Sequence, residues 1–148
     1  MTNIHDIAAY ILQNQGAMST MKLQRLMYYL QAWHITLRGK PLYQEKILAW
    51  AFGPIVYELF KEHHRLFMVS QWPLGDAKKV VENDADFIMA VLSYYGKYNS
   101  EKLSEIINSE EPWQQARKAF MIASDSEQII THEAMQAFYR DQPPPFKL

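Results

Sequence analysis

The chain has 148 residues and a formal net charge of −1, and 49% of its residues are hydrophobic, which suits a single domain with a substantial core. The balanced charge lacks the basic excess of a dedicated nucleic-acid-binding protein, and the absence of cysteine excludes disulfides, thiolate zinc sites and a cysteine nucleophile. No apolar run approaches the roughly 20 residues of a membrane span, and the first residues lack the pattern of a signal peptide, so we expect a cytoplasmic protein.

An amphipathic helix is predicted at the start of the chain. Asn3 can cap it, and Asp6 lies in its first turn, where a negative charge interacts favourably with the helix dipole. Apolar residues follow at helical spacing from Ile4 to Leu12, and Gly16 provides a stop. One face of this helix is therefore expected in the core.

The second predicted helix is longer and carries the widest apolar stripe of the chain. Ser19 or Thr20 can cap it, and its apolar residues recur at helical spacing from Leu23 to Leu37. Gly39 ends it, with a proline just beyond. A stripe of this width indicates a helix at the centre of the fold.

A short apolar segment, Ile47–Phe52, predicts a strand because it is bounded by residues that break regular structure. Gly53 and Pro54 follow it. We expect them to end the strand and to open a third helix, with Pro54 in the first turn, where its missing N–H costs nothing. Ile55 and Val56 would then lie on the apolar side of that helix.

The segment from residue 65 to residue 81 is the least regular part of the chain. Residues 65–70 are compatible with a second strand and also with a frayed continuation of the third helix. Trp72 stands in a loop in front of Pro73, where we expect its side chain to be exposed.

Two more helices follow in the next part of the chain. Asn83 or Asp84 can open the fourth helix, which Gly96 closes. Asn99 can cap the fifth. Both segments carry apolar residues at helical spacing, so both are expected to pack against the core.

The last two predicted helices begin at a proline and at a threonine cap, respectively. Glu110 and Glu111 precede Pro112, and we interpret them as helix N-terminal charges rather than paired catalytic carboxylates. Thr131 caps the last helix. The Pro-rich tail, residues 141–148, cannot continue it and is expected to be extended or disordered.

The histidines give no clear metal site. His63 and His64 are adjacent, so on a helix their side chains diverge by about 100°. His34, His63 and Glu58 could converge in space, but the favoured interpretation places His63 and His64 on the surface and His34 at the edge of the core. The sequence also lacks a Gly-rich phosphate loop, a nucleophile elbow and a His-Glu-x-x-His motif. We therefore predict no catalytic residue, no metal site and no cofactor, and a protein that is not an enzyme.

The second predicted helix also has a basic side interleaved with aromatic residues. Its cations are Lys22, Arg25, Arg38 and Lys40, and its aromatic residues are Tyr28, Tyr29 and Trp33. Such a pattern can bind single-stranded nucleic acid. Tyr28 and Tyr29 are more simply explained as packing at the core edge with hydroxyls that reach water, so nucleic acid is the disfavoured partner.

The sequence around each tryptophan indicates whether its side chain lies in the core. Trp33 and Trp50 lie in apolar contexts and are expected in the core. Trp113, in the first turn of the sixth helix, is expected to close one end of the core. Aromatic residues make up 14% of the chain, which is high, and they also serve as anchors in protein interfaces.

Three segments of the chain, residues 22–34, 39–43 and 47–57, resemble the opening blocks of the Panacea antitoxin domain family, and residues 103–113 resemble its second motif. That family includes SocA-like adaptor proteins and phage-associated proteins of the GepA type. The Trp-x-x-Gly-Pro core is the most specific element. The residues that carry the resemblance, interpreted as scaffold, are Leu23, Leu26, Tyr28, Trp33, Trp50, Gly53, Pro54, Pro112 and Trp113. Ile107 and Asn108 stand where the family often has Thr-His, which weakens any catalytic interpretation further.

The resemblance implies a mainly α domain that occurs in bacteria and on mobile genetic elements such as prophages. We expect a single compact domain over residues 1–140, with six or seven helices and at most a small sheet of two or three strands. Residues 141–148 would form a separate Pro-rich tail.

The resemblance also implies an antitoxin that neutralises a cognate toxin by direct complex formation. Arg25, Tyr43, Tyr57 and Trp72 are the candidate partner-binding residues, because aromatic and arginine side chains dominate interface energies. One alternative is an adaptor that delivers a toxin partner to a cytosolic protease, with the tail as a tether. Another is a nucleic-acid-binding regulator. The oligomeric state stays open.

Overall fold

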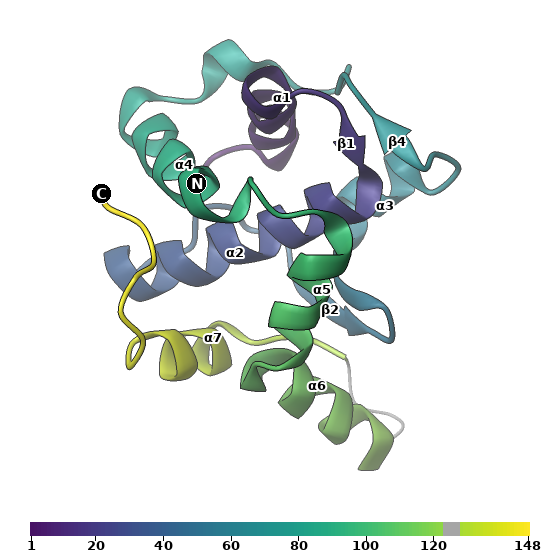
Figure 1. Ribbon diagram of the computed structural model, residues 1–148, viewed down its shortest axis with the longest axis vertical. Coiled ribbons are helices and arrows are strands. Elements are labelled where there is room, and N and C mark those ends of the chain that lie inside the picture. Colours follow the sequence, from purple (N-terminus) through teal and green to yellow (C-terminus); the bar gives the residue numbers. More distant parts are fainter. Residues whose placement is uncertain (123–127) are drawn as a thin grey trace.

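The computed structural model of the protein describes residues 1–122 and 128–148, with the backbone alone for Ile122. In this part of the chain, seven α-helices and two two-stranded sheets form one domain (Figure 1), so the expected mainly α fold is confirmed. None of the described helices is both long and apolar enough to cross a membrane. The helices are α1 (Ile4–Gln15), α2 (Thr20–Arg38), α3 (Tyr57–His63), α4 (Glu82–Tyr95), α5 (Ser100–Asn108), α6 (Glu111–Ile122) and α7 (His132–Tyr139), with a short 3-10 turn, Ala77–Lys79. The strands are β1 (Met18–Ser19), β2 (Ile47–Trp50), β3 (Gly53–Val56) and β4 (Met68–Val69).

Helix α2 lies at the centre of the fold, as its apolar stripe predicts. The Ser19 hydroxyl caps it by accepting from the Lys22 backbone N–H, and Gly39 ends it in the left-handed conformation. It contacts α1, α4, α5, α7, β1 and β3, so neighbours surround it on several sides (Figure 1). Every residue from Leu23 to Ile35 is buried, including the polar ones. Buried polar groups must find hydrogen-bond partners, and on α2 these partners are other segments of the chain.

Two buried glutamines of α2 hold the segment that follows the helix. The Gln24 amide accepts from the Val56 N–H at 2.8 Å and donates to the Val56 carbonyl at 3.2 Å. About two turns further along α2, the Gln31 amide accepts from the Leu42 N–H at 2.7 Å and donates to the Tyr43 carbonyl at 2.6 Å. Each glutamine thus replaces a neighbouring strand for one stretch of backbone.

The Gly-Pro motif does not open a helix, contrary to the sequence prediction. Gly53 and Pro54 begin β3, which pairs antiparallel with β2, and α3 starts only at Tyr57. Pro54 pairs with Ala49, and a proline is tolerated there because β3 is an edge strand. The outer edge of β3 is covered by the Gln24 amide at Val56, which explains why no further strand is needed. Ile55 and Val56 are buried as strand residues, not as helix residues.

The irregular segment after α3 contains a strand, which decides between the two alternatives left by the sequence. Met68–Val69 forms β4 and pairs with β1, with Met18 opposite Val69. The partner strand lies about fifty positions earlier in the chain, so local periodicity could not reveal the pairing. The pair fixes the loop after α3 to the start of α2.

Side-chain caps were predicted for α4, α5 and α7, and those of α5 and α7 are confirmed. The side chains of Asn99 and Thr131 accept from backbone N–H groups of α5 and α7. Helix α4 begins earlier than predicted, at Glu82, and neither Asn83 nor Asp84 caps it. Asp84 instead accepts a hydrogen bond from the Thr2 hydroxyl, which joins the start of the chain to α4.

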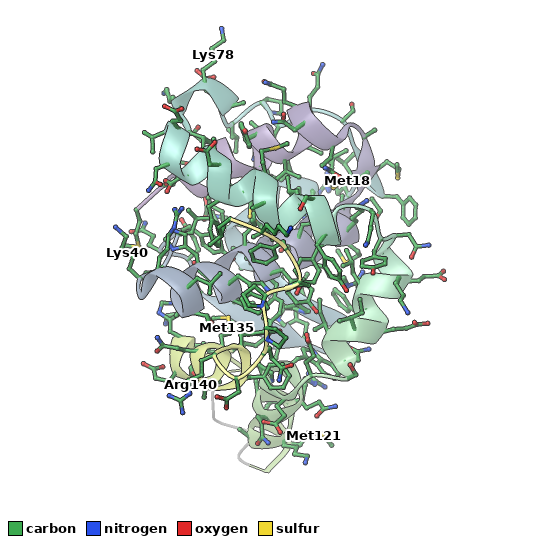
Figure 2. All side chains as sticks on the ribbon, turned by 60° about the vertical axis from the view of Figure 1, so that its left-hand side comes forward. Met18, Lys40, Lys78, Met121, Met135 and Arg140 are labelled. Atoms are coloured by element: carbon green, nitrogen blue, oxygen red, sulfur yellow. The ribbon has the colours of Figure 1, made fainter. Side chains whose placement is uncertain are left out.

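The C-terminal segment packs back on α2 and α4 through Phe146. After α7 it runs toward α4 (Figures 1 and 2) without forming a helix. Phe146 is 9% exposed and packs edge-to-face against Trp33 and Phe87, with ring centroids 5.5 and 6.5 Å apart. The Phe146 ring therefore completes the aromatic core beside α2, while the segment that carries it forms no helix, as the sequence predicts.

Replacing Phe146 with alanine is expected to lower the free energy of unfolding by about 2 kcal/mol, less than for a phenylalanine enclosed on all sides. Urea unfolding followed by tryptophan fluorescence measures the change. Leu148→Ala is the control, because Leu148 is exposed and its removal should cost less than about 0.5 kcal/mol. Equal effects of the two substitutions would contradict the packing role of Phe146.

Candidate protein-binding surface

Four aromatic side chains form a cluster on the surface of the β2–β3 hairpin and α3. We call Trp50, Phe52, Tyr57 and Phe60 the aromatic patch. The Trp50 ring lies 4.9 Å from Phe60, 5.7 Å from Phe52 and 6.3 Å from Tyr57, measured between ring centroids. Phe52 is 49% exposed and Tyr57 is 51% exposed. Grouped aromatic rings at this exposure are typical of protein interfaces.

The hairpin that carries the aromatic patch is held by side chains from two helices. From α6, the Trp113 indole N–H donates to the Trp50 carbonyl at 3.0 Å, and Arg117 donates to the Ala49 carbonyl at 3.1 Å. From α2, Arg25 donates to the Phe52 carbonyl at 2.6 Å. The patch is therefore presented on a rigid support, which reduces the entropy lost when a partner binds.

Gly53 allows Arg25 to reach the hairpin. Its φ of 134° is one that residues with a side chain rarely adopt. A Cβ atom at this position would also lie 3.3 Å from two nitrogen atoms of the Arg25 guanidinium. Arg25 also donates to the Ser100 hydroxyl at the start of α5. The glycine of the motif thus lets one buried arginine join α2, α5 and the hairpin turn.

The predicted partner-binding residues lie in different places. Tyr57 is exposed and belongs to the aromatic patch. Arg25 is buried beneath the hairpin and supports it. Tyr43 is fully buried and donates its hydroxyl to the Met27 carbonyl at 3.0 Å. The expected exposure of Trp72 is wrong: it is 6% exposed, since it stacks on His5 of α1 and donates its indole N–H to that ring at 3.0 Å.

The sequence did not single out Phe52 or Phe60 as site residues. The reason lies in strand alternation, which also corrects the expectation for Trp50. In β2 the buried positions are Ile47 and Ala49, so Trp50 points to the other face and is only partly buried. Trp33 is buried, as expected. The concentration of four aromatic residues between positions 50 and 60 was the available signal.

The histidines are dispersed, and one of them is placed contrary to expectation. His63 is buried, not exposed, and its Nε2 lies 2.9 Å from the Gln24 amide nitrogen. Burial lowers the pKa of His63 and of His34. Glu58 pairs with His5 at 3.2 Å and with Lys61 at 3.0 Å. Within residues 1–122 and 128–148, no group of three or more His, Cys, Asp or Glu residues could hold a metal ion.

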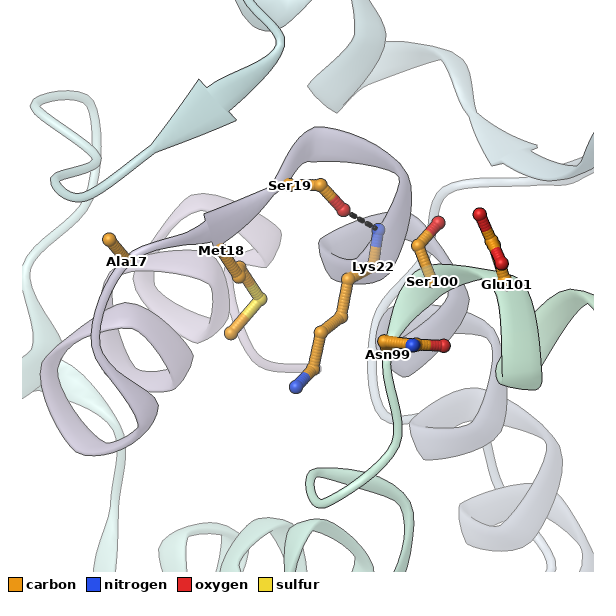
Figure 3. A pocket seen from close by; sticks show the side chains of 7 residues that line it. All are labelled: Ala17, Met18, Ser19, Lys22, Asn99, Ser100 and Glu101. Atoms are coloured by element: carbon orange, nitrogen blue, oxygen red, sulfur yellow. Dashed lines mark hydrogen bonds between the residues drawn. The ribbon is translucent and has the colours of Figure 1, made fainter.

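The cations of α2 are mostly engaged with the rest of the protein. Lys22 borders a surface cavity of about 380 Å³ between the starts of α2 and α5 (Figure 3), and its amine donates to the Gly96 carbonyl at 2.7 Å. Arg38 lies over the Phe87 ring at 4.8 Å and 3.9 Å from Asp84. With Arg25 under the hairpin, three of the four cations serve the packing of α2.

Tyr28 and Tyr29 do not direct their hydroxyls to water, as the sequence suggested, because both are buried. Tyr29 donates to Glu110 Oε1 at 2.7 Å, and Tyr139 donates to the same oxygen at 2.9 Å. Tyr28 lies 3.0 Å from the Tyr139 hydroxyl and donates to it, because the Tyr139 proton is already given to Glu110. Glu110 stands directly before α6, as the sequence predicts, but its carboxyl is only partly exposed and is engaged by these tyrosines. Burial raises the pKa of its carboxyl, although the hydrogen bonds from Tyr29 and Tyr139 oppose the shift.

Glu110→Gln is expected to be at least as stable as the parent protein at pH 7. A carboxyl whose pKa is higher in the folded state binds more protons when folded, so its contribution to stability falls as pH rises from about 4.5 through the raised value. The amide cannot titrate but still accepts from the tyrosines, so the variant should lose this decline. Urea midpoints at pH 5 and pH 7.5 test this, with Glu111→Gln, at an exposed position, as control. A variant destabilised only at neutral pH would contradict it.

Comparison with known proteins gives one match. The family model described as antitoxin SocA-like, Panacea domain, matches residues 23–114, which is more than half of the chain. No curated protein and no solved structure gives a match. The matched region starts on α2 and ends in the first turn of α6, so it contains Arg25, the hairpin with the Gly-Pro motif, the aromatic patch and Trp113. The chain therefore belongs to the SocA-like antitoxin family and carries its Panacea domain.

Proposed function

We propose that this protein is an antitoxin that neutralises a cognate toxin by direct binding, and that the aromatic patch is the surface that contacts the toxin. The family supports the antitoxin-type role. The observation that carries the choice of surface is the cluster of four rings on a braced hairpin, two of them about half exposed. Neutralisation by occupying the toxin needs no catalytic residue in the antitoxin.

Charged side chains next to the aromatic patch would set the orientation of the partner. Glu58 and Lys61 follow Tyr57 on α3 and form an ion pair at 3.0 Å. Exposed pairs of this kind add little stability, but at the rim of an interface they affect association rate and specificity. The patch thus combines a central apolar region with a polar rim, the usual organisation of a binding surface.

Co-expression with the protein encoded beside this gene tests the proposal. The neighbouring protein should arrest growth alone, the pair should restore growth, and a complex of the two should be recovered on purification. Absence of both rescue and complex would refute the antitoxin role for that pair. Toxin abundance in the same cells separates direct binding, which leaves the toxin present, from delivery to a protease, which removes it.

A further inference from the structure

A small cavity lies where the C-terminal segment crosses the domain, away from the hairpin. Its volume is about 180 Å³. The aromatic side chains that line it are Trp33 from α2, Tyr94 and Tyr95 from α4, and Tyr139 from α7. Ile106, Glu110 and three residues of the C-terminal segment, Gln142, Pro143 and Pro145, complete the lining. The cavity therefore combines aromatic walls with a single carboxylate.

Glu110 is a partly exposed acid that accepts two hydrogen bonds on one of its carboxyl oxygens. Tyr29 and Tyr139 both donate to Oε1. Among the ion pairs of the described residues none includes Glu110. A carboxylate has about four acceptor positions, so two hydroxyl donors leave capacity for another donor. Partial burial raises the pKa of Glu110, although the hydrogen bonds from Tyr29 and Tyr139 oppose the shift.

The chemistry of the cavity selects the kind of ligand. The faces of aromatic rings attract cations, and the partly exposed carboxylate of Glu110 adds an opposite charge. One carboxylate does not provide the oxygen ligands that a divalent metal requires. The volume suits a head group of a few heavy atoms. We propose that this cavity binds an alkylammonium or guanidinium group, with Glu110 as the counter-ion and Tyr94, Tyr95 and Tyr139 as the aromatic walls.

The C-terminal segment forms one wall of the cavity. Gln142, Pro143 and Pro145 line it, and the packing of Phe146 on Trp33 and Phe87 holds this segment in place. Release of the segment would remove one wall and hydrate Glu110. Phe146 is thus a positioning residue for the cavity.

Titration of the full-length ¹⁵N-labelled protein with guanidinium chloride in the low millimolar range tests the site by NMR. The probe is the Trp33 indole N–H, which donates to the Tyr95 hydroxyl at 2.9 Å in the cavity wall. We expect a saturable shift of this signal with guanidinium and none with urea, its neutral analogue of similar shape, or with sodium chloride. The Trp72 indole, which bonds to His5, serves as the internal control and should not move.

Glu110→Gln should weaken guanidinium binding at least tenfold while keeping the parent spectrum elsewhere, and Phe146→Ala should weaken it less. Equal shifts with urea, unchanged affinity of Glu110→Gln, or parallel movement of the Trp72 signal would overturn the proposal. The same titration with methylammonium tests whether the cavity also binds an alkylammonium group. With a toxin complex in hand, weaker association of Glu110→Gln would identify an Arg or Lys of the toxin as the ligand, and unchanged association would point to a free amine.

Discussion

Replacing Gln24 with leucine is expected to lower the free energy of unfolding by about 2–6 kcal/mol. Leucine is close in size to glutamine, so the packing volume changes little. The substitution leaves the buried N–H and carbonyl of Val56 without their partners, and each unpaired buried group costs about 1–3 kcal/mol. It also removes the contact with His63 Nε2. The outer edge of β3 would then lack a partner at Val56.

Two matched substitutions separate the hydrogen bonds of Gln24 from the general effect of the change. Gln13→Leu makes the same replacement at an exposed position of α1 and should shift stability by less than about 0.5 kcal/mol. Gln24→Glu keeps an oxygen for the Val56 N–H but loses the donor to the Val56 carbonyl, so it should also destabilise. Urea unfolding measures all three. A stable Gln24→Leu protein would show that the edge of β3 does not depend on this side chain.

Replacing Phe52 or Tyr57 with alanine is expected to weaken toxin binding by about 2 kcal/mol each, roughly 30-fold, mainly through faster dissociation. Both rings are about half exposed, so their loss should change the stability of the free protein little. Surface plasmon resonance or calorimetry with the purified toxin measures affinity, and thermal unfolding verifies that the variants remain folded.

Phe67→Ala provides the matched control for this interface. Phe67 is 79% exposed and precedes β4, in a second apolar region with Leu66 and Met68 that does not include the hairpin. We expect it to bind the toxin like the parent protein. Loss of binding by Phe67→Ala with retention by the Phe52 and Tyr57 variants would move the interface to that region and refute the assignment of the aromatic patch.

Local signals in the sequence were sufficient for most of the helical framework. Ser19, Asn99 and Thr131 cap helices where their side chains suggested, since a cap needs only the next few backbone N–H groups. Gly39 ends α2 for an equally local reason, its left-handed conformation. The prediction of a helix start at Pro54 was wrong, because a proline suits both the first turn of a helix and an edge strand.

The candidate site could be predicted only in part. Tyr57 was proposed as a partner-binding residue and lies in the aromatic patch, but the Gly-Pro motif predicted the start of a helix where the hairpin lies. Trp72 and Tyr43 were also proposed, but both are buried by partners distant in sequence: His5 for Trp72 and Met27 for Tyr43. Exposure depends on which segments pack together, and a single sequence does not encode that in any short spacing.

By itself the sequence determined the fold class, the central position of α2 and the family, because helical periodicity, caps and the Trp-x-x-Gly-Pro motif are all local patterns. Only the tertiary structure shows which hydrogen-bond partners the buried polar groups of α2 have. Gln24 meets Val56 across 32 positions, and Tyr29 meets Glu110 across 81. A buried polar side chain must be hydrogen-bonded, but the identity of its partner follows from the packing of distant segments. That packing places Glu110, predicted as a helix N-terminal charge, against Tyr29 and Tyr139 in the wall of an aromatic cavity.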